Sequence, residues 1–274
     1  MKRTGKSRQR IYDQQPASVY RLPIFKRGRK NDVLPQDGEK QAPYPTPDEG
    51  LQLQGLLIDT NVYLYDRASY DFLRFLRGYF GEYYRGGFDN PEQGSPQREC
   101  DDLEQFPPSP HRLPVASLNL FEAYFLNFIC NSLEIWDGVS SIRISRQNLM
   151  HTFTERDSHF PYMFAVYAHL KRKRYTIKSG LKFGTDFVLY EYGPAVTHSL
   201  YAVHVLIPGI RDSGLAAIDA MQRASNSVKK DLLLVRVNSE GVSDDELMKP
   251  DCFAKMSVME IIVRRRERLT SQAT

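Results

Sequence analysis

The last third of the chain constrains the fold most, because helical and strand-like patterns alternate there within a short span. Residues 160–175 are apolar, with a proline near the start and a basic last turn, which is typical of a helix. Three strand-like runs punctuated by glycines follow. A helical pattern over 214–229 then leads to an apolar run at 231–237, typical of a central strand, and to a final strand at 257–265. This interleaving predicts a compact α/β domain over residues 159–274.

Upstream, residues 51–158 predict a smaller α/β domain that contains a long loop. Apolar residues that alternate and then run together from Leu51 are typical of strands. Residues 88–112 hold five prolines and six acids, a composition that favours a loop. After this loop, Asn119 and Glu122 predict the capping box of a strongly apolar helix. A shorter amphipathic helix is expected before the loop, with four residues on its apolar face: Phe72, Phe75, Leu76 and Tyr79.

Residues 1–50 are predicted to form a flexible basic arm rather than part of the core. They have few aliphatic side chains and six prolines, so they cannot bury enough apolar surface to fold. The first 30 residues carry ten Lys or Arg against one acid, whereas the net charge of the whole chain is only +4. Such an arm suits contact with nucleic acid or with a nuclear-import receptor, although an ordinary solvated tail has the same composition.

The composition also excludes several classes of protein. No apolar run approaches the ~18 residues of a membrane span, and the first residues have no apolar signal core. We therefore expect a protein that is neither secreted nor embedded in a membrane. The three cysteines are odd in number and widely spaced, which fits neither a disulfide framework nor a zinc site. A reducing compartment is the natural expectation.

The loop between two predicted strands carries the candidate chemistry. Tyr190 ends one of these strands, and His198 comes just before the next. Gly193 and Pro194 lie between them and break the strand pattern. A loop that joins adjacent strands lets two such side chains converge on one point. By itself the pair is a weak signal, since a half-buried tyrosine and a loop histidine also occur without any function.

A resemblance to a known family gives these residues a meaning. The segment GLKFGTDF at 180–187, Tyr190, the Gly-Pro pair and His198 resemble the catalytic domain of the tRNA-splicing endonucleases. The stretch 215–237, in which a helix ends in two lysines before an apolar strand, resembles the same family.

The resemblance is dense over residues 160–264 and thinner upstream. There, Arg77–Gly81 and the apolar helix over 120–128 resemble the amino-terminal domain of the catalytic subunit that cuts the 5′ splice site. The basic arm is similar to the opening of that subunit as well.

The resemblance implies a metal-independent endoribonuclease without a cofactor. In this family the ribose 2′-OH attacks the adjacent phosphorus and expels the 5′-oxygen, which leaves a 2′,3′-cyclic phosphate and a 5′-OH, formally a lyase reaction. The implied roles are Tyr190 as base, His198 as acid and Lys230 as electrostatic stabiliser. Lys229 is adjacent, and only the register against the next strand favours Lys230. Because phenols ordinarily titrate near ~10, a second possibility is that Tyr190 orients the 2′-OH without taking its proton.

The resemblance further implies that two cations grip a base of the RNA. The family uses either two cations or an arginine with a tryptophan, and the single tryptophan here, Trp136, lies far upstream. The matching pair is Arg223, expected two helical turns before Lys230 on the same side, and Arg266 in the terminal basic run. The grip serves the active site of the partner subunit. The basic run 171–174 is expected to contact phosphates or to be a solvated helix end.

The implied partners are those of a eukaryotic-type heterotetrameric enzyme. They are an intron-containing pre-tRNA, a second catalytic subunit and two structural subunits, with no membrane insertion. The implied location is the nucleus, or the mitochondrial outer surface in some lineages. The final strand at 257–265 is short and apolar, and we expect it to pair across a subunit interface.

Three alternatives stay open from the sequence. Within the family, the subunit that cuts the 3′ splice site is the closest rival. A non-catalytic RNA-binding subunit of the same assembly is the second, although all three catalytic residue types are present here. The third is a metal-dependent ribonuclease, since LLIDTNVYLYD resembles the first strand of PIN domains, in which an aspartate followed by Thr-Asn holds a divalent metal. That class needs several more carboxylates, and the sequence offers Asp59 and Asp66 but no matching acidic set later in the chain.

Overall fold

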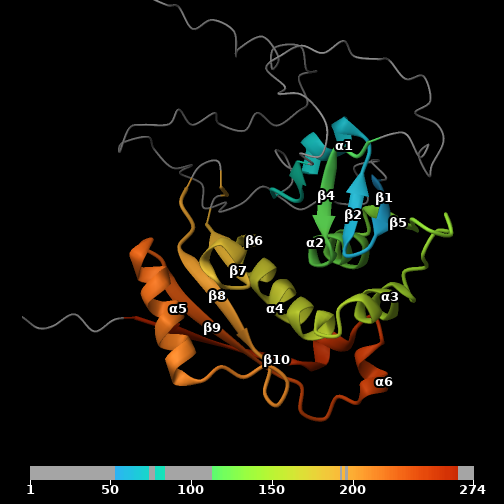
Figure 1. The fold of residues 1–274 in the computed structure, drawn as a ribbon. Helices are drawn as coiled ribbons and strands as arrows, with labels where there is room; N and C mark the ends of the chain where they lie inside the picture. Colours follow the sequence, from blue (N-terminus) through green and yellow to red (C-terminus); the bar gives the residue numbers. More distant parts are fainter. Residues whose placement is uncertain (1–52, 74–77, 84–112, 192, 195–196, 265–274) are drawn as a thin grey trace, which may run out of the picture. The chain divides into compact units, whose positions relative to one another are not determined.

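The structure is a computed structural model that describes residues 53–73, 78–83, 113–191, 193–194 and 197–264 (Figure 1). The basic arm and the loop over 88–112 lie outside these residues and stay predictions. The domain boundary expected between residues 158 and 159 also stays a prediction. Within the described residues, the strands form two five-stranded sheets and helices connect and cover them, which confirms the predicted α/β class. Of the helices described, none combines the length and the apolar character needed to cross a membrane.

The first sheet has the strand order β3-β4-β2-β1-β5. The apolar segment predicted to begin at Leu51 is a hairpin in which β1 and β2 pair antiparallel around a turn at Asp59. β5 adds to the other side of β1 as a parallel strand. β3, β4 and β5 are short and were not predicted. The strands span Leu53–Ile58 (β1), Asn61–Leu64 (β2), Glu82–Tyr83 (β3), Ala116–Asn119 (β4) and Leu133–Asp137 (β5).

The helix predicted around residues 72–79 is only partly described, because residues 74–77 lie outside the described part of the chain. α1 spans Arg67–Asp71 and begins at Asp66, whose carboxylate accepts the N–H groups of Ala68 and Ser69, and the next two residues are π-helical. Tyr79 does not share a helix face with Phe72, because its φ of +61° is left-handed and lies outside any helix. This part of the prediction was wrong, since glycines flank the Tyr79–Phe80 pair and allow a turn there.

The second predicted helix is confirmed together with its cap. α2 spans Leu120–Tyr124, and the side chains of Asn119 and Glu122 form the predicted capping box. The helix continues as a π-helical turn over Phe125–Ile129. A further helix, α3 (Leu149–Arg156), was not predicted.

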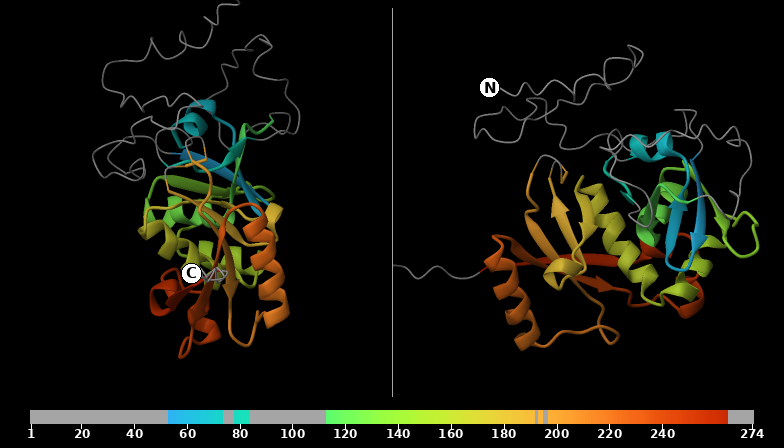
Figure 2. Two further views of the ribbon diagram at one scale, coloured as in Figure 1. Left: turned by 90° about the vertical axis from the view of Figure 1, so that its left-hand side faces the viewer. Right: turned by 45° about the horizontal axis from the view of Figure 1, so that its top comes forward.

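The second sheet contains the strands predicted for the last third, in the order β10-β9-β8-β7-β6. Its pairs are antiparallel except for β8 and β9, which run parallel and are joined through α5. α4 and α5 lie on opposite faces of this sheet (Figures 1 and 2). The elements are α4 (Phe160–Arg172), β6 (Thr176–Ser179), β7 (Phe187–Tyr190), β8 (Tyr201–Leu206), α5 (Leu215–Ser227), β9 (Asp231–Asn238), α6 (Asp244–Leu247) and β10 (Ser257–Val263).

A single hydrophobic cluster runs from the first sheet through α4 to the second sheet. Aromatic rings form much of it. The Phe121 ring stacks on Phe160 of α4, with centroids 5.6 Å apart, and meets Phe187 of β7 edge-on at 5.6 Å. The Tyr124 hydroxyl donates a hydrogen bond to the carbonyl of Pro250 at 2.7 Å. The strands that carry the candidate site therefore rest on side chains from the amino-terminal half of the chain.

The basic run at the end of α4 is not uniformly solvated. Lys171 is only 1 % exposed, which corrects the expectation of a solvated or phosphate-binding run at that position. Its ammonium lies 4.1 Å from the centroid of the Phe80 ring. Burial lowers the pKa of Lys171 to about 7, while the nearby Glu122 raises it and Lys178 lowers it further. The aromatic rings attract the ammonium and offset part of this cost.

Lys171 should make stability depend on pH in a predictable direction. Between about pH 7 and its ordinary pKa near 10.4 the unfolded chain binds more protons than the folded one, so the free energy of unfolding rises with pH. From pH 7 to 8.5 we expect this side chain to contribute a rise of roughly 1–2 kcal/mol. Urea unfolding of the wild type and of Lys171→Met across that range measures the difference. If the two show equal slopes, Lys171 does not change its charge in this range.

Candidate active site

Three adjacent strands of the second sheet have an end at the same edge, where β7 ends and β8 and β9 begin. The register pairs Leu189 of β7 with Tyr201 of β8, and Tyr201 with Asp231 of β9. Just before β8, the Leu200 N–H donates to the Leu189 carbonyl at 2.8 Å, one residue off this register, and the Asp231 N–H donates to the Leu200 carbonyl at 3.1 Å. At this end of the sheet Tyr190 closes β7, while Leu200 and Lys230 directly precede β8 and β9.

The predicted base lies on the face that carries α5. The Phe187 ring contacts Tyr167 of α4, with centroids 6.2 Å apart, so alternation along β7 turns Tyr190 to the opposite face. On the approach to β8, Ser199 is 5 % exposed, whereas its neighbours on both sides, including His198, are exposed. His198 is thus exposed in the segment that leads into β8.

The order of the three predicted residues across the sheet is Tyr190, His198, Lys230. Neighbouring strands lie about 4.8 Å apart, so Tyr190 and Lys230, on the outer two of three strands, have backbones about 10 Å apart. His198 belongs to the segment that enters the middle strand. The fold thus places the three residues at one end of the second sheet, while their meeting in one site and their roles stay predictions.

The geometry distinguishes between the two neighbouring lysines. Lys229 is exposed in a turn with φ +56°, whereas Lys230 is half-buried. The Lys230 ammonium lies 3.5 Å from the carbonyl oxygen of Ser199, the residue that follows His198, and 5.0 Å from the centroid of the Phe183 ring. Its side chain therefore reaches toward the segment that carries His198, and this favours Lys230 as the member of the site.

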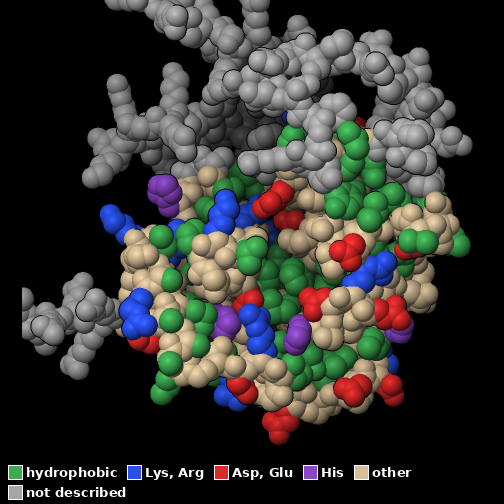
Figure 3. Space-filling model, in the orientation of Figure 1, with side chains coloured by type: hydrophobic (Ala, Val, Ile, Leu, Met, Phe, Trp, Pro, Cys, Tyr) green, Lys and Arg blue, Asp and Glu red, His purple; other side chains and the backbone are tan. Residues whose placement is uncertain are grey.

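Only one of the two predicted base-gripping arginines, Arg223, lies in the described part of the chain, so the pair stays a prediction. Arg223 lies on α5, 71 % exposed, and pairs with Asp219 at 2.6 Å. It is not on the same helical side as Lys230, because α5 ends at Ser227. Arg266 lies outside the described residues. In Figure 3, basic side chains on the side of the molecule that carries α5 are mixed with acidic ones.

A second polar network, which sequence reasoning missed, lies at the start of β7. The Asp186 carboxylate lies 3.3 Å from Nδ1 of His204 and 2.8 Å from the Arg211 guanidinium, and it accepts the N–H of Val205 at 2.8 Å. His204 also hydrogen-bonds the Ser213 hydroxyl through Nε2 at 2.8 Å.

The contacts of this network hold the backbone in place at the start of β7. Burial would raise the pKa of Asp186, but the hydrogen bonds from His204, Val205 and Arg211 outweigh it and hold the pKa below its ordinary value. His204 is 7 % exposed. The network fixes the start of β7 to β8 and to the segment that leads into α5. The order Asp–His–Ser resembles a hydrolase triad, but the Asp186 carboxylate also accepts the backbone N–H of Val205 and pairs with Arg211.

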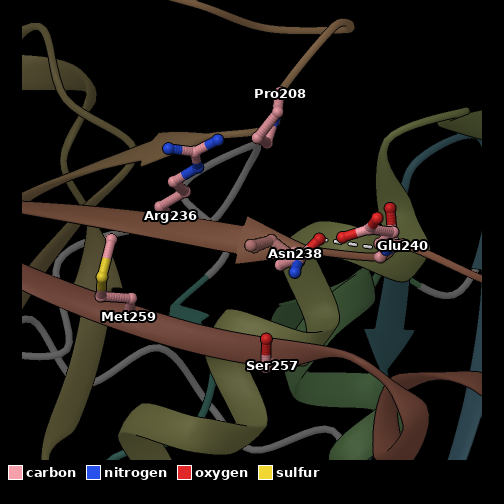
Figure 4. Close-up of a pocket in the computed structure, with 8 residues that line it drawn as sticks. Pro208, Arg236, Asn238, Glu240, Ser257 and Met259 are labelled. Carbon is pink, nitrogen blue, oxygen red and sulfur yellow. Dashed lines mark hydrogen bonds between the residues drawn. The ribbon is translucent and has the colours of Figure 1, made fainter.

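A surface hollow lies at the other end of β9 and is separate from the candidate site. Arg236, Asn238, Ser257 and Met259 line it, and the Glu240 N–H donates to Oδ1 of Asn238 at its rim (Figure 4). Arg236 and Asn238 are five and seven residues from the first residue of β9, so this hollow lies about 17–23 Å along the strand from its start.

Comparison with known proteins places the site within a recognised family domain. Residues 160–244 match the model of the tRNA intron endonuclease, catalytic C-terminal domain. The matched range contains the three predicted catalytic residues: Tyr190, His198 and Lys230.

Individual relatives carry the name of one particular subunit. The chain is 32 % identical over 151 residues to the probable tRNA-splicing endonuclease subunit Sen2 of Oryza sativa subsp. japonica, covering 53 % of this chain and 50 % of the relative. It is 31 % identical to subunit Sen2-1 of Arabidopsis thaliana (54 % and 62 % covered) and 28 % identical to subunit Sen2 of Gallus gallus (54 % and 33 % covered). These matches confirm the resemblance found in the sequence. The chain spans between a third and two thirds of the length of these relatives.

Proposed function

We propose that this chain is the subunit of a tRNA-splicing endonuclease that cleaves pre-tRNA at the 5′ splice site. The observation that supports the proposal is that Tyr190 ends β7, His198 shortly precedes β8 and Lys230 directly precedes β9, at one end of the sheet and inside the matched catalytic domain. The names of the Sen2 relatives support the choice of subunit.

In the proposed mechanism the three residues divide the work of one transesterification. Tyr190 takes the proton of the ribose 2′-OH, or orients this hydroxyl while water or a phosphate oxygen takes the proton, and the 2′-oxygen forms a bond to the adjacent phosphorus. His198 gives a proton to the 5′-oxygen as the P–O bond breaks, which leaves a cyclic phosphate and a 5′-OH. The Lys230 ammonium faces the negative charge that builds on the phosphorane. Each proton transfer is worth roughly 10²–10⁴ in rate.

The proposed chemistry assigns no metal, because two proton-transfer groups and one fixed cation complete it. The PIN-type alternative assigns Asp59 and Asp66 to a divalent ion. Asp66 instead caps α1, accepting the Ser69 N–H at 2.7 Å and the Ser69 hydroxyl at 2.6 Å. Asp59 sits in the β1–β2 turn. Both positions have structural uses in the hairpin and the helix that follows it, which weighs against this alternative.

The proposed assembly includes a second catalytic subunit and two structural subunits. β10 supports a subunit interface, because in the described part of the sheet it pairs with β9 alone. Glu260, on one face of β10, is bound by His169 at 2.8 Å and by Lys173 at 2.6 Å, which fixes the strand to α4. Three apolar side chains of the same strand are 43–51 % exposed: Met259, Ile261 and Ile262.

The remaining parts of the proposal concern RNA binding and location. The basic arm and the arginines Arg223 and Arg266 are proposed to bind RNA, the arginines by stacking on a base in the site of the partner subunit. The proposed compartment is the nucleus, with the mitochondrial outer surface as the variant in some lineages.

Replacing His198 by alanine should abolish one cut and spare the other. In the complex co-purified with a tagged copy of this chain, His198→Ala should slow cleavage at the 5′ junction by about 10²–10⁴, because the leaving oxygen loses its acid. Cleavage at the 3′ junction should continue with a cyclic phosphate end, and EDTA should leave both wild-type cuts unchanged. Gel analysis of an intron-containing pre-tRNA measures all three.

Other outcomes of this experiment select other functions. Loss of the 3′ cut alone would assign the chain to the other catalytic subunit, and survival of both cuts would make it a non-catalytic subunit. Loss of the wild-type 5′ cut in EDTA would support the metal-dependent alternative.

Substitutions of Lys229 and Lys230 should affect the cleavage rate differently. Lys230→Ala should slow the 5′ cut by about 10²–10³, since a preorganised charge facing the reacting phosphate is lost. Lys229→Gly is the matched control: it removes the adjacent charge and relieves a left-handed residue, so both the rate and the melting temperature should be retained. A slow Lys229→Gly variant beside an active Lys230→Ala variant would reverse the assignment.

A further inference from the structure

The motif Arg77–Gly81 has no role in the proposed chemistry, yet its described residues, 78–81, form an unusual turn. Three of its described residues have left-handed backbones: Gly78 with φ +100°, Tyr79 with φ +61° and Gly81 with φ +73°. Glycine adopts this conformation without cost, whereas tyrosine does so rarely and under strain. A strained residue persists only where its surroundings fix it, and such residues gather at functional sites.

The backbone on the carboxyl-terminal side of Tyr79 is held firmly. Phe80 is fully buried, and its N–H donates to the carbonyl of Leu73 at 3.3 Å. The Gly81 carbonyl accepts a hydrogen bond from the ammonium of Lys178 at 2.9 Å. Lys178 lies on β6, the strand beside β7, and also pairs with the buried Glu122 at 3.2 Å. The turn is therefore tied to the sheet that carries the candidate site.

The ring of Tyr79 lies directly against the loop between β7 and β8. Gly193 in that loop is buried and has φ +101°. A Cβ atom added to Gly193 would lie 2.6 Å from Cδ2 and 2.7 Å from Cζ of Tyr79, closer than any real contact allows. The aromatic ring thus occupies the space in which any other residue at position 193 would place its side chain.

The same glycine holds the residue next to the predicted acid. The Gly193 carbonyl accepts the Thr197 N–H at 3.1 Å and the Thr197 hydroxyl at 3.4 Å. Thr197 directly precedes His198. A continuous set of contacts therefore runs from Tyr79 through Gly193 and Thr197 to His198.

We propose that Tyr79 is a positioning residue for the catalytic loop. Its ring backs the loop at Gly193 and so sets where His198 stands relative to Tyr190 and Lys230. Tyr79 contributes through the loop rather than by contact with the RNA. The inference rests on the proposed function, because it concerns the acid of that same reaction. It also gives the amino-terminal half of the chain a part in cleavage.

A glycine at position 79 separates positioning from folding. Tyr79→Gly removes the ring and also relieves the left-handed strain, so the melting temperature should not fall by the amount that loss of a core residue causes. Single-turnover cleavage at the 5′ junction by the co-purified complex should slow about 10- to 100-fold, because the acid is misplaced. The complex concentration that gives half the maximal rate should stay within about twofold, since no RNA contact is lost.

Two further variants serve as controls. Tyr79→Phe keeps the ring and should cleave like the wild type. Ser141→Gly relieves a left-handed residue, φ +57°, in the turn after β5 and should leave the rate unchanged. An unslowed Tyr79→Gly variant would overturn the proposal. So would a Tyr79→Phe variant as slow as Tyr79→Gly, because the hydroxyl rather than the ring would then matter.

Measuring His198→Ala beside these variants distinguishes a failure of the positioning role from a failure of the proposed function. If His198→Ala abolishes the 5′ cut and Tyr79→Gly does not slow it, the positioning role alone is wrong. If His198→Ala leaves the 5′ cut intact, the proposed function is wrong, and the inference that rests on it is wrong too.

Discussion

The hydrogen-bond ladder across β7, β8 and β9 is the constraint on which the site depends. Leu200 joins Leu189 to Asp231 through one donated and one accepted backbone hydrogen bond. Because side chains alternate along strands, this register also decides which residues share a face. A slip of one residue in β9 would turn Lys230 to the α4 face and away from Tyr190. The chemistry proposed here thus depends on backbone pairing as much as on the reactive groups themselves.

The amino-terminal half supports that register from two directions. Phe121 packs against both α4 and β7, and the buried Glu122 holds Lys178 of β6. Through Lys178 the Gly78–Gly81 turn is fixed, and Tyr79 meets the loop at Gly193. Rigid strands thus carry Tyr190 and Lys230, while His198 lies in a loop that is backed by a side chain from another part of the chain.

Much of the fold and the candidate site was predictable from the sequence, for local reasons. The Asn119 capping box, the Pro161 start of α4 and the apolar run of β9 are set by neighbouring residues, and each appears as predicted. Contacts between distant residues were not predictable. Tyr79 has the spacing of a helix face but sits in a left-handed turn, and Lys171 has the pattern of a solvated helix end but is buried under Phe80. The Asp186–His204 network was hidden because alternation along a strand does not reveal which polar residue meets another.

The central claim, that His198 supplies the proton to the leaving oxygen, is tested most directly by changing the leaving group. A pre-tRNA with a bridging 5′-sulfur at the 5′ junction loses a thiolate, which needs no proton to depart. The account predicts that His198→Ala cleaves this substrate within about tenfold of the wild type, while it remains about 10²–10⁴ slower on the ordinary oxygen substrate. An equal defect on both substrates would contradict the role of His198 as the acid.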